Sequence, residues 1–137
     1  AKGKNLIPAS GSWERSEVMS WLAFTGSDFQ KAFGPIFWAS RWTSDTAAQL
    51  AIKNATLASI EKHLAYIDQS LAGKEYLVGK NFTVADAFLF VIAGWCKWSE
   101  VKIGQHTNLT AYLKRIYARP AVQKVLAKEE MVDFIPA

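Results

Sequence analysis

The amino-acid sequence predicts an all-α domain, a bundle of about five helices, and three observations lead to that prediction. Apolar residues between positions 46 and 72 recur at steps of three, four and seven, which is the stripe of an amphipathic helix. Residues 83–98 are apolar on nearly all sides, which is typical of a helix in the middle of a bundle. The chain shows neither the alternation of a half-buried strand nor an Asn-Gly or Asp-Gly hairpin turn. The stripe comprises Leu50, Leu57, Ile60, Leu64, Ile67 and Leu71.

The first helix is predicted from residue 13 to residue 33. Ser10 or Ser12 precedes it and can accept a hydrogen bond from an unpaired backbone N–H group of its first turn. Gly34-Pro35 breaks or kinks this helix, because proline has no N–H to donate and clashes with the preceding turn. A short apolar stretch that contains Phe37 follows.

The second helix is predicted from about residue 46 to residue 72 and carries the apolar stripe. Either Ser44 or Asp45 is placed to cap its first turn. Gly73 suits the left-handed backbone position that commonly ends a helix, because glycine has no Cβ to clash there. The following residues, up to the next helix, are predicted to form a loop.

Three further helices are predicted in the C-terminal half. The central one covers residues 83–98. After a loop, Asn108 can cap a helix over residues 109–117. Pro120 begins a last short helix, because proline is well suited to the first helical turn. The tail, residues 131–137, is apolar and is predicted to pack back onto the bundle.

The composition indicates a folded domain and argues against two functional classes. Half of the residues are apolar and a fifth are charged, and the net charge is +4. The positive charges are scattered, which is typical of solvated helix faces, so we expect no nucleic-acid binding; attraction to an anionic ligand or partner is the less favoured alternative. The longest nearly unbroken apolar run, residues 84–95 with Asp86 as an interruption, is too short to cross a bilayer, so we expect no membrane association.

The single cysteine, Cys96, allows neither an internal disulfide nor a zinc cluster of cysteines, and we interpret it as a small buried hydrophobe. This suits a reducing compartment, and no apolar signal core follows the N-terminus, so a cytoplasmic location is expected. We interpret His63 as a surface helix residue and His106 as a loop residue. Motifs for a metal, a nucleotide phosphate or a nucleophilic serine are not found, so we expect no metal and no tightly bound cofactor.

The most specific local pattern is Gly-Lys-Asn-Phe-Thr-Val-Ala-Asp-Ala at residues 79–87. Thr83 and Asp86 have the spacing of a capping box, in which the Thr83 side chain accepts from the backbone N–H of Asp86 and the Asp86 side chain accepts from that of Thr83. Leaving such donors unpaired in a buried helix end costs about 1–3 kcal/mol each. We therefore predict a structural rather than a catalytic role for both residues.

This pattern resembles the helix-capping signature of the C-terminal domain of glutathione transferases. The kinked first helix, residues 10–37, and the Tyr-Ala-Arg-Pro-Ala-Val segment, residues 117–122, resemble further parts of that domain in the same order. The resemblance covers residues 10–137, with residues 1–9 as a linker or N-terminal extension, and it is to the beta class of bacteria. It implies a right-handed bundle of about five helices.

In that family, glutathione is held mainly by an N-terminal thioredoxin-like domain, which also activates its thiol. No segment before Ser10 resembles such a domain, so the resemblance implies a chain that is not catalytic on its own. The helical domain supplies the apolar wall of the electrophile site and much of a homodimer interface. Glutathione and a small apolar electrophile would then be the ligands of a longer protein. On the resemblance, the wall comprises Phe33, Phe37, Phe88 and Trp95.

The sequence departs from the family where glutathione is expected. Beta-class enzymes carry a histidine followed by a lysine close to the glutathione sulfur, and here the pair is Gln30-Lys31. Glutamine can hydrogen-bond a thiolate but cannot take its proton, whereas Lys31 stays available to an anionic ligand. The resemblance places Asp28 where an acidic side chain meets the ammonium group of glutathione across the dimer. Ala23 replaces a polar residue that is expected one turn earlier.

Two functions from different classes follow. As the C-terminal domain of a glutathione transferase, the chain would serve a longer detoxification enzyme with glutathione as co-substrate. As a stand-alone interaction scaffold, similar to helical domains of this family in translation assemblies, it would dock by its helix faces and do no chemistry. The apolar wall and Lys31 favour the first function, and the missing histidine fits the second. A carrier of apolar ligands is a weaker third alternative.

Overall fold

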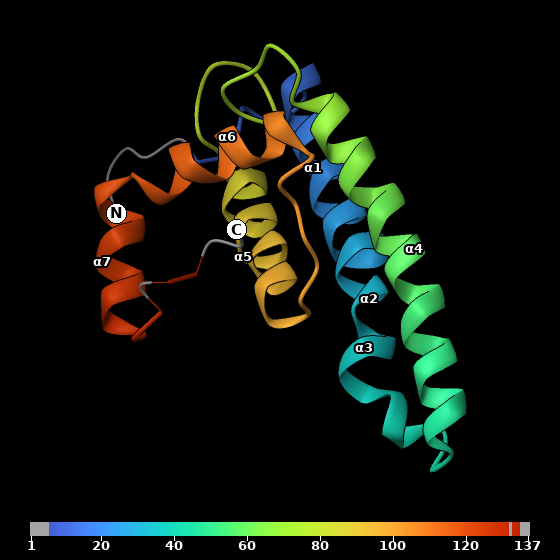
Figure 1. The fold of residues 1–137 in the computed structure, drawn as a ribbon. Helices are drawn as coiled ribbons and strands as arrows, with labels where there is room; N and C mark the ends of the chain where they lie inside the picture. The colour runs from blue at the N-terminus through green and yellow to red at the C-terminus, as the bar shows by residue number, and fades with distance from the viewer. Residues whose placement is uncertain (1–5, 132, 135–137) are drawn as a thin grey trace.

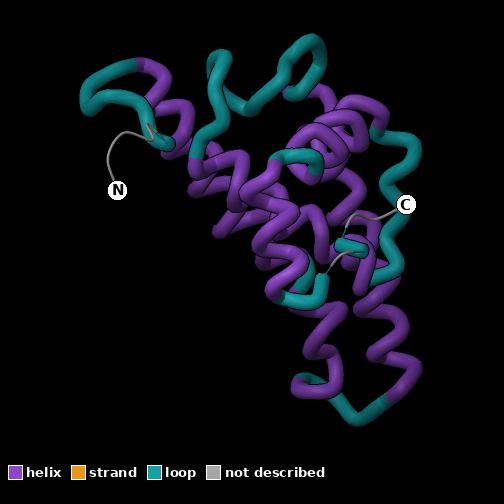
Figure 2. The backbone as a smooth tube through the Cα atoms, turned by 90° about the vertical axis from the view of Figure 1, so that its left-hand side faces the viewer, coloured by secondary structure: helices purple, strands orange, loops and turns teal. Residues whose placement is uncertain are grey.

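The computed structural model describes residues 6–131, 133 and 134, which form helices and contain no β-strand (Figures 1 and 2). The predicted all-α class is therefore confirmed for the described part of the chain. Residues 1–5 of the predicted N-terminal extension and residues 132 and 135–137 of the predicted tail lie outside it. The five principal helices are α1 (Trp13–Phe24), α4 (Thr46–Ser70), α5 (Val84–Trp98), α6 (Thr107–Tyr117) and α7 (Pro120–Lys128).

The predicted first helix is divided into several parts. After α1 come a π-helical turn, η1 (Thr25–Phe29), and two short helices, α2 (Gln30–Ala32) and α3 (Gly34–Trp38), then the 3-10 turn η2 (Ala39–Arg41). The break at Gly34-Pro35 is confirmed, whereas the π-helical turn was not predicted. Three residues spaced by four, Thr25, Phe29 and Phe33, are all fully buried. Four residues of an α-helix turn by about 400°, and the wider π-helical turn takes up this excess rotation.

The structure decides between the alternative caps of the two long helices. Ser12 caps α1, because its side-chain oxygen accepts a hydrogen bond from the backbone N–H of Arg15 at 3.1 Å. Asp45 caps α4 by accepting from the backbone N–H of Ala47 at 2.8 Å. Gly73, just beyond α4, has the predicted left-handed backbone with a φ of +70°.

The predicted cap of α6 is wrong. The helix begins at Thr107, so Asn108 lies inside its first turn and His106 is the N-cap residue. The orphan backbone N–H of Leu109 donates instead to Asp68 Oδ1 of α4 at 2.9 Å, and the Asn108 side-chain amide donates to Asp68 Oδ2 at 3.1 Å. The Asp68 carboxylate of the neighbouring helix α4 therefore caps α6, which is the role that was predicted for Asn108.

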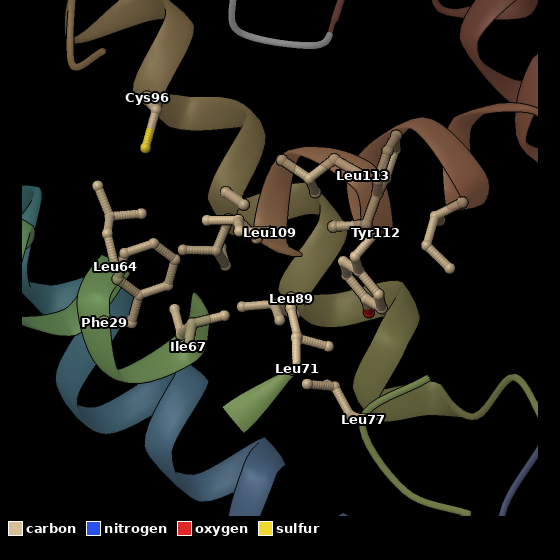
Figure 3. Close-up of a cluster of buried hydrophobic side chains, with 14 of the residues drawn as sticks. Phe29, Leu64, Ile67, Leu71, Leu77, Leu89, Cys96, Leu109, Tyr112 and Leu113 are labelled. Atoms are coloured by element: carbon tan, nitrogen blue, oxygen red, sulfur yellow. The ribbon is translucent and has the colours of Figure 1, made fainter. Parts of the chain in front are cut away.

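The core lies where α4, α5 and α6 converge, with α5 in the middle of the bundle (Figure 3). This confirms the central position predicted for the apolar helix. Along the predicted stripe of α4, Ile60, Leu64, Ile67 and Leu71 are buried and Leu57 is half-buried. The prediction that the whole stripe is buried is wrong at Leu50, whose side chain is 59 % exposed. In Figure 1 the first turns of α4 extend beyond α5 and α6 beside α3, so this end of the helix lies outside the region where α4, α5 and α6 converge.

The end of the described chain packs back onto α5, as predicted for Met131 and Phe134. The Phe134 ring lies 5.2 Å from Phe90 and 5.7 Å from Trp98, centroid to centroid, and covers Gly94. A Cβ atom at position 94 would lie 2.1 Å from Phe134 Cζ. Only glycine at position 94 leaves room for the Phe134 ring against α5.

Candidate functional site

Three of the four residues predicted to form an apolar wall contact one another. Phe33 and Phe37, at the junction of α2 and α3, meet Trp95 of α5. The ring centroids are 6.2 Å apart for Phe33 and Phe37, 5.8 Å for Phe33 and Trp95, and 5.7 Å for Phe37 and Trp95. The two contacts of Trp95 are edge-to-face and the contact of Phe33 with Phe37 is stacked, and both arrangements fix ring orientation as well as burying area. We call these three residues the aromatic cluster.

The three rings differ in what they offer to a ligand. Phe33 is fully buried, whereas Phe37 is 37 % exposed and Trp95 is half-buried. Phe33 therefore supports the other two rings from beneath, and the surface open to a ligand belongs to Phe37 and Trp95. Trp38, which is 45 % exposed and lies 6.2 Å from Phe37, extends this surface and was not among the predicted wall residues.

Phe88 occupies a different place. It lies seven residues before Trp95 on α5, so both face the same side of that helix. Its ring packs against the π-helical turn, where a Cβ atom at Gly26 would lie 3.4 Å from Phe88 Cε1. Among the described residues, no ring contact joins Phe88 to the aromatic cluster. Phe88 thus borders the turn that carries the predicted glutathione-facing residues.

Those polar residues lie directly before the aromatic cluster in the same helical segment. Asp28 is exposed on the π-helical turn and accepts a hydrogen bond from the Ser27 hydroxyl at 2.6 Å. Gln30 is half-buried and Lys31 is exposed on α2. Within the described part of the chain neither Asp28 nor Lys31 is in an ion pair, so both charges are open to a ligand. We call Asp28, Gln30 and Lys31 the polar edge.

The predicted capping box forms, and it is part of a larger network. Asp86 is fully buried, and its Oδ2 accepts from the backbone N–H of Thr83 at 2.7 Å and from the Thr83 hydroxyl at 2.9 Å. Its Oδ1 accepts from the backbone N–H of Leu77 at 2.9 Å and from the Tyr112 hydroxyl at 3.0 Å. The carboxylate thereby joins the loop before α5 to α6. The structural interpretation of Thr83 and Asp86 agrees with this geometry.

His106 lies in the loop before α6, as predicted, and His63 lies on α4 but is less exposed than the predicted surface residue. His106 is only 6 % exposed and its Nε2 lies 3.1 Å from Glu61 Oε1 of α4, so the loop residue packs against the bundle. His63 is half-buried, with its ring 5.7 Å from that of Phe24 and 6.2 Å from that of Phe29. The described residues hold no group of three or more acidic, histidine or cysteine side chains that could bind a metal ion. Across the same residues, every helix is too short or too polar to traverse a bilayer.

Two buried groups, the Cys96 thiol and the Tyr112 hydroxyl, make the free energy of unfolding depend on pH in the alkaline range. Burial raises the pKa of the Cys96 thiol to about 12, so Cys96 is no nucleophile at neutral pH. Burial and the adjacent Asp86 carboxylate raise the pKa of Tyr112 well above its usual range. In the unfolded chain these groups ionise near pH 8.5 and 10 respectively, at roughly their ordinary values.

We predict that the contribution of these two groups to the free energy of unfolding is constant below about pH 8.5. It falls as pH rises above that value, because only the unfolded chain then loses their protons. The expected slope is about 1.4 kcal/mol per pH unit for each such group. Urea unfolding from pH 7.5 to 11 measures it. Cys96→Ala should flatten the first part of the decline, between about pH 8.5 and 10. A decline unchanged in this variant would contradict the role of Cys96.

Comparison with known proteins decides the family. Residues 27–129 match the family described as "Glutathione S-transferase, C-terminal domain". The chain belongs to the glutathione S-transferase family. The glutathione S-transferase GstA of Escherichia coli O157:H7 is 28 % identical over 126 residues, which are 92 % of this chain and 59 % of that protein. Elongation factor 1-gamma of Schizosaccharomyces pombe is 28 % identical over 123 residues, 88 % of this chain and 30 % of that protein.

Solved glutathione S-transferases share the fold. The sphingomonad enzyme complexed with glutathione is 37 % identical with a TM-score of 0.80, and the match covers 93 % of this chain and 60 % of that one. The bacterial beta class enzyme of Sphingomonas chungbukensis is 38 % identical, with the same TM-score and the same coverage. The chain thus spans about 60 % of the length of these family members. It corresponds to their C-terminal helical domain.

Proposed function

We propose that this chain is the C-terminal domain of a glutathione S-transferase of the beta class and supplies the apolar wall of its electrophile site. One observation carries the proposal: the polar edge directly precedes Phe33 and Phe37 in one helical segment, and these rings pack with Trp95. A polar peptide and an apolar electrophile could therefore bind side by side. Solved relatives named as glutathione S-transferases, one of the beta class and one complexed with glutathione, support it.

The polar edge suits binding of glutathione better than activation of its thiol. Lys31 presents a cation to a carboxylate of glutathione, and Asp28 presents an anion to its ammonium group. Gln30 can donate a hydrogen bond to the thiolate but cannot accept a proton from the thiol at neutral pH. Thiol activation is then the task of a preceding domain. The helical domain adds proximity by holding the electrophile against Phe37 and Trp95.

One face of the chain, along α1 and α4, is suited to bind a second copy of the chain. Along α1 and α4, four aromatic side chains line a groove of about 250 Å³ together with the polar Ser16, Glu17 and Ser20. Trp13 is 77 % exposed and Tyr66 is 52 % exposed, and both line this groove. We assign this face to a homodimer interface, because exposed aromatic side chains are enriched at such interfaces. The proposal includes a cytoplasmic, detoxifying enzyme as the longer protein.

The test uses this chain joined in frame, at residue 6, to the N-terminal part of the Sphingomonas chungbukensis enzyme. Conjugation of glutathione to 1-chloro-2,4-dinitrobenzene should be at background for the 137-residue chain alone and measurable for the chimera. Trp95→Ala and Phe37→Ala in the chimera should raise KM for the dinitrobenzene roughly tenfold while the KM for glutathione stays unchanged. Leu50→Ala is the matched control, because Leu50 is an exposed apolar residue that does not belong to the cluster. Conjugation by the isolated chain, or unchanged kinetics in both variants, would overturn the proposal.

An interaction scaffold is the second candidate function. The observation that favours it is Gln30, which stands where the resemblance expects a histidine and which cannot take a proton at neutral pH. The match to elongation factor 1-gamma shows that the helical domain also occurs in a protein named for translation. A folded chimera that neither binds glutathione on a glutathione affinity matrix nor conjugates it would favour the scaffold.

A further inference from the structure

A hollow on the outside of the bundle brings cationic and polar side chains together. It has a volume of about 450 Å³ and lies between the loop that precedes α5 and the junction of α6 with α7. Its walls are formed by Tyr76, Lys80, Asn81 and Phe82 of the loop and by Arg119 of the junction. In Figure 1 this loop lies beyond the end of α4 that is opposite to α3, so the hollow is separate from the polar edge and from the aromatic cluster.

The backbone and two aromatic rings hold Arg119 in place at the hollow. Its backbone N–H donates to the Ile116 carbonyl oxygen at 3.1 Å, just before Pro120 begins α7. Its guanidinium carbon lies 4.0 Å from the centroid of the Phe82 ring, and its Nη1 donates to the Tyr76 hydroxyl oxygen at 3.3 Å. A guanidinium fixed over a ring loses less conformational freedom when it binds a ligand, so Arg119 is prepared for binding.

The donors that line the hollow have no acceptor within the described part of the chain. The hydrogen bond to Tyr76 is the only one that the Arg119 side chain makes there, and Arg119 is in no ion pair. The Tyr76 hydroxyl oxygen accepts from Arg119, so its own O–H is left to donate to a ligand. The ammonium group of Lys80 and the side-chain amide of Asn81 are exposed and are likewise unpaired among the described residues.

The charge around the hollow favours an anion. Among the described residues that line it, none is acidic. Glu75, next to Tyr76 in the chain, is exposed and is not one of the lining residues. Arg115, one helical turn before Arg119, adds a further cation beside the hollow, because its Nη1 donates to the Glu75 carbonyl oxygen at 2.9 Å. An anionic ligand is therefore attracted to this place more strongly than a neutral one.

We propose that this hollow binds a phosphate group, either as the free ion or as the end of a small phosphate monoester. A planar carboxylate is satisfied by the guanidinium fork alone, whereas a tetrahedral phosphate also accepts from the ammonium, phenol and amide donors on the other walls. A phosphate monoester carries a charge of about −1.5 to −2 at neutral pH, which matches the two lining cations. The site is independent of the proposed function, because it shares no residue with the polar edge or the aromatic cluster.

Nuclear magnetic resonance of the isotope-labelled 137-residue chain tests the proposal. Inorganic phosphate and glycerol 3-phosphate are titrated separately at constant ionic strength, with acetate as the carboxylate control. The signals of the Asn81 side-chain amide, of Arg119 Nε–H and of residues 76–82 should shift to saturation, with a Kd on the order of 1 mM. Saturation by both phosphates would identify a monoester site, and saturation by inorganic phosphate alone would identify the free ion as the ligand. No saturable shift with either phosphate, or equal binding of acetate, would overturn the proposal.

Three variants separate a phosphate site from diffuse attraction to a basic chain. Arg119→Lys keeps the net charge but removes the guanidinium fork, so phosphate binding should weaken roughly tenfold. Lys62→Met removes the charge of an exposed lysine on α4 that does not line the hollow, so binding should be unchanged. Tyr76→Phe removes only the hydroxyl and keeps the ring, and binding should weaken roughly threefold.

The net charge of the chain and the hollow predict opposite results for these variants. If Arg119→Lys and Tyr76→Phe bind phosphate as tightly as the unchanged chain, or if Lys62→Met weakens binding as much as Arg119→Lys does, phosphate is an adventitious ion only and the proposal is overturned. The Tyr76→Phe result decides the matter by itself if Arg119→Lys disturbs the loop, because that variant leaves both cations and the Phe82 ring in place.

Discussion

Asp86→Ala is expected to lower the free energy of unfolding by about 3–5 kcal/mol. The carboxylate is fully buried and accepts four hydrogen bonds, two from Thr83, one from the backbone N–H of Leu77 and one from the Tyr112 hydroxyl. Alanine leaves these donors in the interior without an acceptor, and each such buried donor costs about 1–3 kcal/mol. The loss should therefore exceed that of an ordinary cap, which is about 1 kcal/mol.

Urea unfolding followed by circular dichroism measures this loss. Tyr112→Phe is the matched variant, because it removes one of the four donors and keeps the ring, so about 1 kcal/mol should be lost. Asp86→Asn keeps two acceptor positions on one oxygen and should fall between the two. If Asp86→Ala destabilises the chain no more than Tyr112→Phe, the network does not hold the loop and α6 together as described.

Phe33→Ala is expected to lower the free energy of unfolding by about 3–5 kcal/mol, whereas Phe37→Ala should lower it by about 1 kcal/mol or less. The two residues stand four apart and contact the same Trp95 ring, yet Phe33 is fully buried and Phe37 is 37 % exposed. Removing the Phe33 ring leaves a cavity between α2, α4 and α5, and removing the Phe37 ring opens a position that water already reaches.

The two variants are compared by urea unfolding, with tryptophan fluorescence as a second probe because Trp95 contacts both rings. The proposed electrophile site adds a kinetic expectation: in the chimera, Phe37→Ala should change the KM for the electrophile at nearly unchanged stability. Equal destabilisation by the two substitutions would mean that Phe33 does not support the aromatic cluster from beneath.

Features determined by neighbouring residues along the chain could be predicted from the sequence. The capping box of Thr83 with Asp86 and the start of α7 at Pro120 each depend on side chains within three residues of a helix end, and the cap of α4 was predicted to be either Ser44 or Asp45. The apolar periodicity likewise located α4 and α5, because helical spacing is itself local. The choice between Ser10 and Ser12 as the cap of α1 was left open, because both are suitable acceptors and only the backbone conformation selects one.

Features determined by contacts between distant segments could not be predicted in this way. Asp68 caps α6 from 41 residues away, and Tyr112 reaches Asp86 across 26 residues. Leu50 fits the stripe of α4 by spacing, but its exposure depends on where the neighbouring helices end. Among the candidate site residues, the resemblance placed Phe33, Phe37, Phe88 and Trp95 on one apolar wall, and three of them, without Phe88, are in ring contact. It did not indicate that Phe33 is buried beneath the other two.

The π-helical turn at Thr25–Phe29 has a consequence for how the family varies. Such a turn holds one residue more than the α-helical turn it replaces, so deletion of a single codon could restore a regular helix. The wider turn takes up the rotation of its extra residue, so everything after the deletion would keep nearly the same orientation relative to α1. Gln30 and Lys31 would keep their places in space, and only their positions in the residue count would change by one. Relatives should therefore be compared beyond Phe29 by position in space, because counting residues from the helix start aligns the wrong residues with Gln30 and Lys31.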